Sequence, residues 1–409
     1  AMPDPTAQKS AGARFIAYMI REKPDLLFKI LRNLRPNFAA PNNGPVFITR
    51  FRDVQEALER PEIFRVTYAP MMDPSVGPYM LGRDGTTINQ RDKGIMRSLM
   101  QREDLPRVRG IVAQLAAEAL AEAAPMRSIE VVANLSRKVP IQFTGEYFGF
   151  PGPDLESMFR WSRATQYDMF HNIDKDPDVH QRNIDAGHEM HAYLSQLIPQ
   201  RRKELETDPS LDDILSRLLK SRFDDAIGFD EERIMTNMMG TLVGGIETTS
   251  QAIVQILDQL FKRPETLEEA TAAAQDDDDD KLYRYCWEAL RFNPINPFVV
   301  RQCAEDYTIA SGTLRSTKIK AGRIVLISTR SAMRDGRELC CPNDFCIDRP
   351  DYHYMHTGYG LHTCLGDQIS QVQIPQIVKQ LLKRSNLRPI GEIDFKGGPF
   401  PESYTVGFE

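Results

Sequence analysis

Thr357-Gly358-Tyr359-Gly360-Leu361-His362-Thr363-Cys364-Leu365-Gly366, late in a chain of 409 residues, is the stretch from which the fold can be predicted. Its alternate glycines indicate a tight turn, and an apolar helical pattern follows the cysteine. A cysteine at a helix start meets unpaired backbone N–H groups, which favour its thiolate form. The stretch therefore predicts an anionic sulfur that binds a metal, beside a turn that lets a large flat group approach the backbone.

A second stretch lies inside the longest helical pattern, residues 229–262. Asp230 suits an N-cap and Pro264 lies just past the end, so we expect one long helix. Its middle reads Gly244-Gly245-Ile246-Glu247-Thr248-Thr249, where the glycine pair costs a helix about 2 kcal/mol relative to alanines. The Thr248 hydroxyl can bond the carbonyl one turn back and open the helix. A local violation inside a strong element is expected at a functional site.

Together these stretches resemble motifs of the cytochrome P450 family. The cysteine run matches the family's Phe-Gly-x-Gly-x-His-x-Cys-x-Gly pattern except at Thr357, where the family has Phe. The helical run matches its Ala/Gly-Gly-x-Asp/Glu-Thr-Thr/Ser pattern without a departure. Glu288-x-x-Arg291 and the later Arg349 resemble its buried structural ion-pair cluster. The order and separation of these motifs match the family over essentially the whole chain.

The resemblance implies a single domain over residues 1–409, mainly α with a small β region. Haem b, iron protoporphyrin IX, would lie between the helix of residues 230–262 and the helix after the cysteine loop. Cys364 would be the axial metal ligand, whose sulfur pushes electron density onto iron to favour O–O cleavage. Glu247 and Thr248 would manage protons as the catalytic pair.

The resemblance also implies further cofactor and substrate contacts. Lys93 and Arg97 lie one turn apart on a predicted helix, where like charges cost about 0.2–0.5 kcal/mol unless an anion such as a haem propionate lies between them. The residues expected to contact the cofactor are Lys93, Arg97, Gly244, Arg301, His362 and Cys364. The residues expected to contact substrate are Tyr68, Met71, Met80, Phe170, Gly245, Pro297, Phe298 and Tyr404.

Residues 66–87 have little periodicity and contain exposed-looking methionines and aromatics, which predicts either an adaptable apolar pocket or an ordinary covered loop. Tyr404 is expected near the tip of a hairpin at residues 399–406. Helical patterns are expected at residues 105–124, 134–148, 155–170 and 188–205. Pro375 is expected to interrupt the helix after Cys364, and the acidic run 276–280 to form a solvated loop or a helix cap.

Charge and cysteine usage limit the partners and the compartment. The 51 basic and 57 acidic residues are mixed along the chain and give a net charge of −6, so no nucleic-acid partner is expected. The six cysteines show no disulfide-framework spacing, which favours a reducing cytoplasm. Cys340-Cys341-x4-Cys346 matches no zinc pattern and predicts a plain loop. No apolar run reaches the roughly 20 residues of a membrane span, so we expect a soluble monomer without a membrane anchor.

These features predict a monooxygenase that inserts one oxygen atom from O2 into an apolar small molecule, such as a fatty acid, a terpenoid or an aromatic compound. Electrons would come from a separate ferredoxin or flavodoxin-type donor with its NAD(P)H reductase. One alternative is a peroxygenase, or an enzyme that isomerises hydroperoxides; the Glu247-Thr248 pair argues against it. The other is a haem sensor or haem-binding protein, which would need no proton relay.

Overall fold

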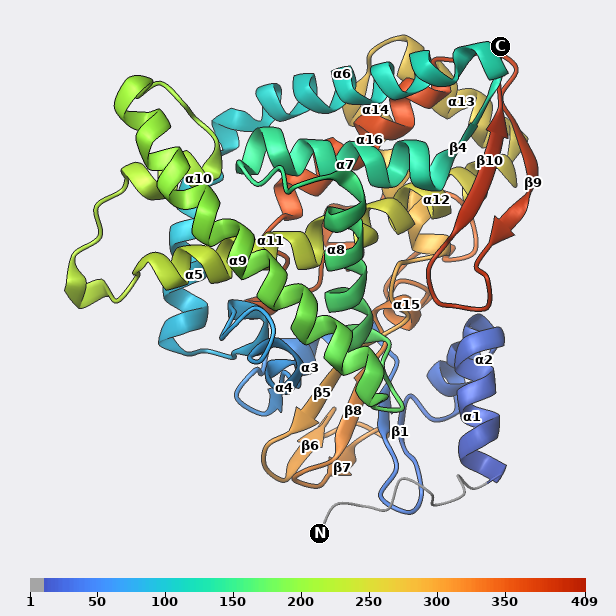
Figure 1. Cartoon of the computed structure of the whole chain (residues 1–409). Coiled ribbons are helices and arrows are strands. Elements are labelled where there is room, and N and C mark those ends of the chain that lie inside the picture. The colour runs from blue at the N-terminus through green and yellow to red at the C-terminus, as the bar shows by residue number, and fades with distance from the viewer. Residues whose placement is uncertain (1–10) are drawn as a thin grey trace. The chain divides into compact units, whose positions relative to one another are not determined.

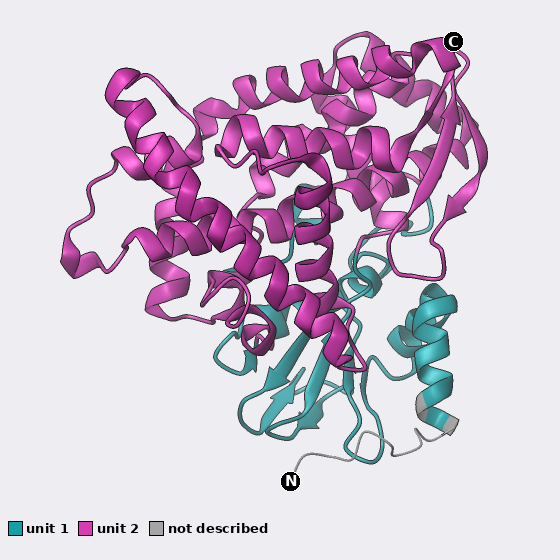
Figure 2. Cartoon of the chain, in the orientation of Figure 1, with its two compact units in different colours: residues 1–65, 296–344, 351–361 teal, residues 66–295, 345–350, 362–409 magenta. Residues whose placement is uncertain are grey.

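The computed structural model describes residues 11–409, which divide into two compact units (Figure 2). Unit 1 holds residues up to 65 with 296–344 and 351–361, and unit 2 holds residues 66–295, 345–350 and 362–409. Each unit is built from segments far apart in the sequence. The prediction of one domain stays a prediction.

Unit 1 is built on a five-stranded sheet of order β1-β2-β8-β5-β3. Its strands are rich in β-branched and aromatic residues, which pack well on a pleated surface. Only β2 and β8 pair in parallel, with Val46 opposite Val325. Strands β6 and β7, which lie between β5 and β8 in the sequence, form a separate two-stranded sheet (Figure 1). The strand bounds are β1 Asn37–Ala39, β2 Val46–Ile48, β3 Phe64–Arg65, β5 Val299–Cys303, β6 Tyr307–Ile309, β7 Thr317–Ile319 and β8 Ile324–Ile327.

Helices α1 (Ala11–Glu22), α2 (Pro24–Leu34), α3 (Phe51–Leu58) and α15 (Thr329–Ala332) complete unit 1. Helix α3 buries Phe51 and Val54 in an apolar core that it shares with Val46 and Ile327 of the sheet. Burial of such side chains stabilises the unit by about 1.5–3 kcal/mol each.

Unit 2 is predominantly helical, as Figure 1 shows from α4 through α16. Helix α16 packs along α6, and α8 packs along α9. The helix bounds are α4 Ala69–Met72, α5 Thr87–Leu99, α6 Leu105–Ala123, α7 Lys138–Phe143, α8 Leu155–Phe170, α9 Pro177–Thr207, α10 Ile214–Lys220, α11 Glu231–Gly245, α12 Glu247–Phe261, α13 Pro264–Gln275, α14 Asp279–Phe292 and α16 Asp367–Leu382. The helix-rich class with small sheets confirms the predicted fold class. No helix among residues 11–409 combines the length and apolar character needed to cross a bilayer.

The helix expected over residues 230–262 is divided in two, so the prediction of one continuous helix is wrong. Asp230 does cap its start, since its side chain accepts a hydrogen bond from the Arg233 N–H. The α-helical backbone stops at Ile246, with φ −108° and ψ −68°, and α12 begins at Glu247. The break follows the two glycines, whose missing side chains make the helical conformation least favourable there.

Three other helices differ from expectation. Helix α9 begins eleven residues before 188, at Pro177, with Asp176 as its cap. Residues 134–148 are not one α-helix, because π-helical segments at Val132–Arg137 and Thr144–Phe148 flank α7. Helix α16 continues through Pro375 instead of ending there. Burial of the α16 side chains that face α6 and α14 stabilises the helix by more than the roughly 3 kcal/mol that an internal proline costs.

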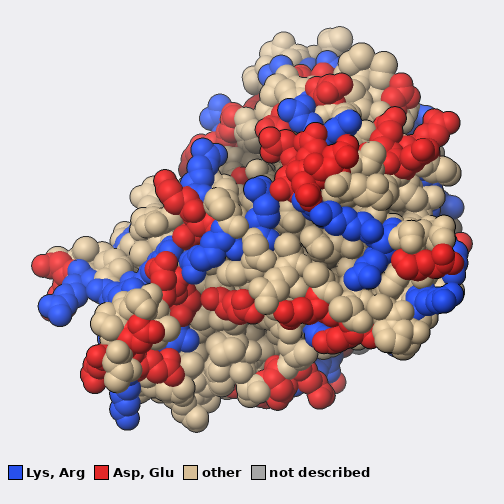
Figure 3. Space-filling view, turned by 90° about the horizontal axis from the view of Figure 1, so that it is seen from above, with Lys and Arg blue, Asp and Glu red and all other residues tan. Residues whose placement is uncertain are grey.

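The acidic run is partly a helix cap, as expected, but it is not simply solvated. The Asp278 side chain caps α14 by accepting from the Lys281 N–H at 3.0 Å. Asp277 accepts from Lys379 and Lys383 of α16, and these two lysines lower its pKa to about 2. The run therefore ties the start of α14 to α16. Figure 3 shows acidic and basic side chains similarly interspersed across the face in view.

A three-stranded sheet of order β4-β10-β9 completes unit 2, with β4 at Ser128–Glu130, β9 at Arg388–Asp394 and β10 at Ser403–Gly407. Strands β9 and β10 form an antiparallel hairpin, with Ser403 opposite Asp394 and the loop between them. Tyr404 is the second residue after this loop, so it lies near the tip as predicted, although the hairpin is longer than the expected 399–406. Its side chain is buried; burial raises the pKa of its hydroxyl, and Asp258 of α12 acts in the same direction. Its expected contact with substrate stays a prediction.

Candidate active site

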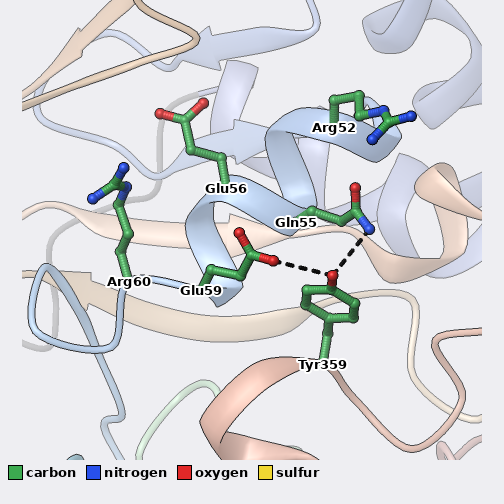
Figure 4. A pocket seen from close by; sticks show the side chains of 6 residues that line it. All are labelled: Arg52, Gln55, Glu56, Glu59, Arg60 and Tyr359. Atoms are coloured by element: carbon green, nitrogen blue, oxygen red, sulfur yellow. Dashed lines mark hydrogen bonds between the residues drawn. The ribbon is translucent and has the colours of Figure 1, made fainter. Parts of the chain in front are cut away.

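The glycine-rich turn is held by side chains of unit 1. Gly358 and Gly360 adopt φ values of +84° and +68°, which favour glycine. A Cβ at Gly360 would also lie 2.8 Å from the Leu58 carbonyl oxygen, so no larger residue fits. Between them, the Tyr359 hydroxyl donates to Glu59 at 3.0 Å and accepts from Gln55 at 3.1 Å (Figure 4). Glycine is thus required here by both backbone conformation and space.

The hollow around Tyr359 is not the expected apolar substrate pocket. It has a volume of about 480 Å³ and is lined by residues of α3 and the turn after it. The lining residues are Arg52, Gln55, Glu56, Glu59, Arg60 and Tyr359. Its polar, charge-balanced lining contains none of the residues predicted to contact substrate.

Cys364 lies in unit 2, three residues before α16 begins. Its sulfur accepts the Gly366 N–H at 3.3 Å. Although the side chain keeps an exposed surface, loss of water around it raises the pKa of the thiol. The Gly366 N–H and the charges of Lys93 and Arg97 act in the opposite direction. The N–H group at the helix start thus acts on the thiol pKa in the predicted direction, but desolvation is the larger effect and the net shift is upward.

Helix α5 presents Lys93 and Arg97 to this sulfur. Lys93 is buried and donates to the Thr363 carbonyl oxygen at 2.7 Å, and desolvation together with Arg97 lowers its pKa to about 8. Arg97 is exposed and forms no ion pair with any residue in the described part of the chain. The two cations thus lie beside Cys364 on the same helix, as the spacing predicts.

Asp92 fixes the orientation of α5, and its role was not predicted. It is fully buried and accepts hydrogen bonds from Arg91, Arg233 and Asn237, the last at 3.0 Å. Because Arg233 and Asn237 belong to α11, this carboxylate joins α5 to the helix that carries the glycine pair.

His362 was expected to contact a propionate. Its Nε2 atom lies 2.9 Å from the Asp84 carboxylate, and its side chain is largely buried. Asp84 also accepts the Val66 N–H. His362 therefore links the cysteine loop to the loop of residues 66–87, a contact that differs from the expected one.

The break between α11 and α12 forms the second half of the candidate site. The Thr248 hydroxyl donates to the Gly244 carbonyl oxygen at 2.5 Å, as the sequence predicts. A Cβ built on Gly244 or Gly245 meets no other atom within 4 Å. Earlier on α11, a Cβ at Gly240 would clash at 2.3 Å with Tyr79, and Tyr79 is close enough to Cys364 for that sulfur to influence its pKa. The open space at the glycines and the sulfur with cationic neighbours fit a flat, iron-bearing group such as haem.

Glu247 is a buried carboxylate held by two arginines. It is 1% exposed, and Arg137 Nε donates to Oε1 at 2.9 Å. Arg163 donates twice to Oε2, at 2.9 and 2.7 Å. Both arginines also bind Glu402, at 3.1 and 2.6 Å. We call these four residues the Glu247 cluster.

Aromatic rings cover the Glu247 cluster. Arg137 and Arg163 lie over the Phe159 ring, and Arg163 also lies over Phe400, at 4.3 Å from its centroid. The His171 ring meets Phe400 edge-on at 4.8 Å. Burial, together with the positive charge of Arg163, lowers the pKa of His171 to about 4, so the imidazole is neutral at pH 7.

Sequence reasoning missed Arg137, Arg163 and Glu402. Arg137 is 110 residues and Arg163 is 84 residues from Glu247 along the chain. No local spacing marks such a contact. The available signal was physical: a buried helix carboxylate requires cationic partners.

Glu288, Arg291 and Arg349 form a fully buried group. Arg291 donates to Glu288 at 2.9 and 2.7 Å, and Arg349 Nε lies 3.2 Å from the same carboxylate. Glu288 also accepts the Cys346 N–H at 2.9 Å. The structure thus brings the three predicted residues together and fastens the segment before the cysteine loop to α14.

Residues predicted to contact substrate are only partly brought together. Tyr68 lies against Phe170 with ring centroids 5.1 Å apart. Tyr68 and Met80 are buried, which agrees with the covered-loop alternative for residues 66–87. The Met71 carbonyl accepts from Asn183 of α9 at 2.9 Å, which holds this loop to the helix.

Three expected residues belong to unit 1. Arg301 is buried in β5 and donates to the Val300 carbonyl at 2.8 Å. The Pro297 carbonyl accepts from Ser328, and Phe298 packs on the apolar core beside Phe47. Their expected contacts with cofactor or substrate stay predictions.

Comparison with known proteins identifies the family. Residues 153–396 match the sequence model described as "Cytochrome P450". Mycinamicin IV hydroxylase/epoxidase of Micromonospora griseorubida is 26% identical, over 82% of this chain and 81% of the relative. Steroid C26-monooxygenase of Mycolicibacterium smegmatis is 24% identical, over 90% of this chain and 88% of the relative.

Solved structures agree in fold. The crystal structure of CalO2 superposes with a TM-score of 0.81 at 20% identity, covering 95% of this chain and 97% of that chain. P450BioI, in complex with an acyl carrier protein ligated to hexadec-9Z-enoic acid, gives a TM-score of 0.80 at 19% identity, covering 96% and 100%. Because the family match spans more than half of the chain and relatives of similar length are hydroxylases and monooxygenases, this chain belongs to the cytochrome P450 family and is a monooxygenase.

Proposed function

We propose that this monooxygenase inserts one oxygen atom from O2 into an apolar small molecule, by hydroxylation or epoxidation, and releases the other as water. The family implies haem, and Cys364 is the proposed axial ligand, with Lys93 and Arg97 as cationic partners of the propionates. When bound, haem supplies the iron chemistry that activates O2. The observation that carries the proposal is the helix break at Ile246, after which the Thr248 hydroxyl donates back to Gly244, beside the open space at the two glycines.

The hydroxyl of Thr248 is oriented for proton delivery. Its own hydrogen is directed to the Gly244 carbonyl, so its oxygen lone pairs are left to accept a hydrogen bond. A water molecule that donates to this oxygen would be held beside the glycines, where reduction of O2 requires protons. Thr248 therefore positions a proton donor.

Glu247 supplies the link from this position to solvent. The Glu247 carboxylate is buried, but Arg163, which binds it, has a side-chain exposure of 21%. Glu402, which binds Arg163, has a side-chain exposure of 22%. The guanidinium groups between Glu402 and Glu247 accept no proton, so a proton that enters at Glu402 would reach the buried carboxylate through water beside the arginines. Arg137 and Arg163 act as positioning residues that hold Glu247 in place.

The substrate is proposed to be apolar, because Tyr68, Phe170 and Met80 offer aromatic and thioether surface. Relatives are named for mycinamicin IV, cyclomarin C and a steroid, so these compounds belong in the first screen with fatty acids, terpenoids and aromatic compounds. Electrons are proposed to come from a ferredoxin or flavodoxin-type protein with its NAD(P)H reductase.

The first test is the absorption spectrum of the dithionite-reduced protein with and without carbon monoxide. A Soret band shifted far to the red would support thiolate ligation through Cys364. A band at the position of histidine-ligated or thiol-ligated haem would contradict it. Thiolate-positive protein can then be screened for substrates by spin-state change.

The second test concerns Thr248. Thr248→Ala should lower the product formed per NAD(P)H by at least about tenfold, while reductant consumption continues and yields peroxide or water. Thr144→Ala is the control for loss of a threonine hydroxyl, because Thr144 also donates to a carbonyl one turn back, at 2.8 Å, outside the site. Product yield equal to wild type in Thr248→Ala, or turnover with peroxide but none with reductant and O2, would contradict the proposal.

A further inference from the structure

Two adjacent thiols lie in contact on the surface of unit 1. The sulfur atoms of Cys340 and Cys341 are 3.4 Å apart, and both residues are exposed. Neither takes part in the monooxygenase site. The expectation of a plain loop does not account for two nucleophilic side chains held at this distance.

The backbone holds the pair in place from both sides. Leu339, the residue before the pair, is completely buried, and its N–H donates to the carbonyl of the buried Asp335 at 2.9 Å. After the pair, the Asp344 N–H donates to the Cys341 carbonyl at 3.0 Å and closes a turn that contains Pro342. Cys341 itself has φ +46°, a conformation that is unfavourable for a non-glycine residue. The two sulfurs are therefore positioned by a folded loop.

The distance suits a centre that bonds to both sulfurs. With metal–sulfur bonds of about 2.3 Å, two sulfurs at a tetrahedral angle lie about 3.8 Å apart, close to the observed separation. Direct closure to a disulfide is less suited, because adjacent Cα atoms lie about 3.8 Å apart, below the usual disulfide range of about 4.4–6.8 Å. The geometry favours bidentate binding by the open dithiol.

The number of ligands limits the kind of centre. Among residues 11–409, no group of three or more His, Cys, Asp or Glu side chains is arranged to hold a metal ion. The pair supplies two sulfur ligands, which is too few for a structural zinc site. It suits a soft, thiophilic centre that brings its own third substituent.

We propose that Cys340 and Cys341 form a chelating dithiol site for trivalent arsenicals of the type R–As=O. The two thiol groups form two As–S bonds, and the arsenical oxygen leaves as water with both thiol protons. Arsenic stays trivalent, so the step needs no oxidant or reductant. Both sulfurs are then bonded to the same arsenic atom, in a ring that includes the peptide bond between the two residues.

The remaining cysteines do not offer an equivalent pair. Cys286 and Cys303 are buried, and burial raises the pKa of both thiols, so they react slowly. Cys364 is the proposed iron ligand. Cys346 is partly buried and provides a matched single-thiol control.

Phenylarsine oxide is the probe, and the haem-loaded enzyme is the sample. Intact-mass analysis should show one phenylarsenic group per chain with loss of two thiol hydrogens. The adduct should survive excess 2-mercaptoethanol and be released by 2,3-dimercaptopropanol, because only a dithiol competes with a chelate. Cys340→Ser and Cys341→Ser should each weaken binding by on the order of a hundredfold, whereas Cys346→Ser should bind as wild type.

Two results would overturn the assignment. One is an adduct that 2-mercaptoethanol removes from the wild-type enzyme, which would mean that only one thiol binds. The other is a wrong assignment of the sulfurs: an adduct that still resists 2-mercaptoethanol in Cys340→Ser or Cys341→Ser, or an adduct that is lost in Cys346→Ser. All three positions lie on or near the surface, so serine substitution leaves the core intact.

Discussion

At the scale of single residues, the Glu247 cluster is the most consequential group in the site. The charge of a carboxylate that is 1% exposed must be compensated, and here two arginines do so, while Glu402 balances their second positive charge. Removal of one cation leaves buried charge uncompensated, which costs more than the pair contributes when intact. Stability and proton transfer therefore depend on the same side chains.

Arg163→Gln should lower the free energy of unfolding by about 2–3 kcal/mol, because Glu247 loses two of its hydrogen bonds. Arg160→Gln, on the same helix, removes an ion pair whose partners are 50% and 45% exposed, and should cost at most about 1 kcal/mol. Urea unfolding of both variants checks this. Equal losses would mean that solvent already screens the cluster.

His171 makes stability depend on pH. Its folded pKa is lowered to about 4 from the ordinary 6.5, so the unfolded chain binds a proton between these values and the folded chain does not. Its contribution is complete above pH 6.5 and is lost as pH falls toward 4. In this window wild type should lose up to about 1.4 kcal/mol per pH unit more than His171→Gln. Urea unfolding between pH 7 and 4 measures the difference, and equal slopes for the two proteins would contradict it.

At the scale of elements, two glycines on α11 have opposite surroundings. Gly244 faces open space, whereas a Cβ at Gly240 would meet the Tyr79 ring at 2.3 Å. Helix propensity alone would treat them alike. Their difference comes from what packs against each turn of the helix.

Gly244→Ala should raise the free energy of unfolding by about 0.5–1 kcal/mol, because alanine favours the helix and nothing obstructs it. It should also weaken substrate or haem binding, since the methyl group enters the space beside Thr248. Gly240→Ala should instead destabilise the protein by about 1–3 kcal/mol through overpacking. Thermal unfolding and substrate titration distinguish them, and a stability loss in Gly244→Ala would show that the space is already filled.

Elements with strong local signals could be predicted, and contacts between distant elements could not. The helix at Leu155–Phe170 follows from its apolar period, and the Thr248 hydrogen bond follows from the chemistry of threonine in a helix. The end of α11 at Gly245 was only suggested by its composition. The hairpin that carries Tyr404 was predicted too short, because strand register depends on pairing with β4 and β9, which no local pattern specifies.

At the scale of the whole molecule, the sequence is divided between two compact units, and the candidate iron ligand with the helix break lies in unit 2. A ligand stabilises the region of a protein that must be folded for the ligand to bind. Unit 1 has its own sheet and apolar core. The response of each unit to cofactor loading is therefore a measurable property.

Haem removal should accelerate hydrogen exchange in α11, α12 and α16 by at least about tenfold, with a smaller change at β2 and β8 of unit 1. Hydrogen exchange followed by mass spectrometry, with and without haem, checks this. An equal change in both units would show that they open as a single cooperative domain, and no change in α16 would argue against cofactor binding at Cys364.

The π-helical segment Val132–Arg137 sets the direction in which the Arg137 side chain points, and therefore whether it reaches Glu247. A π turn holds an extra residue compared with an α turn, and one residue rotates everything after it by about 100°. Arg137, at the end of this segment, faces Glu247 in the phase that the extra residue creates. Deletion of one residue from 132–136 would turn the guanidinium away from the carboxylate while leaving the composition of the helix almost unchanged. In relatives without the extra residue, an arginine with this role would have to occur one position away, so insertions and deletions here would change the proton path without any substitution at the catalytic pair.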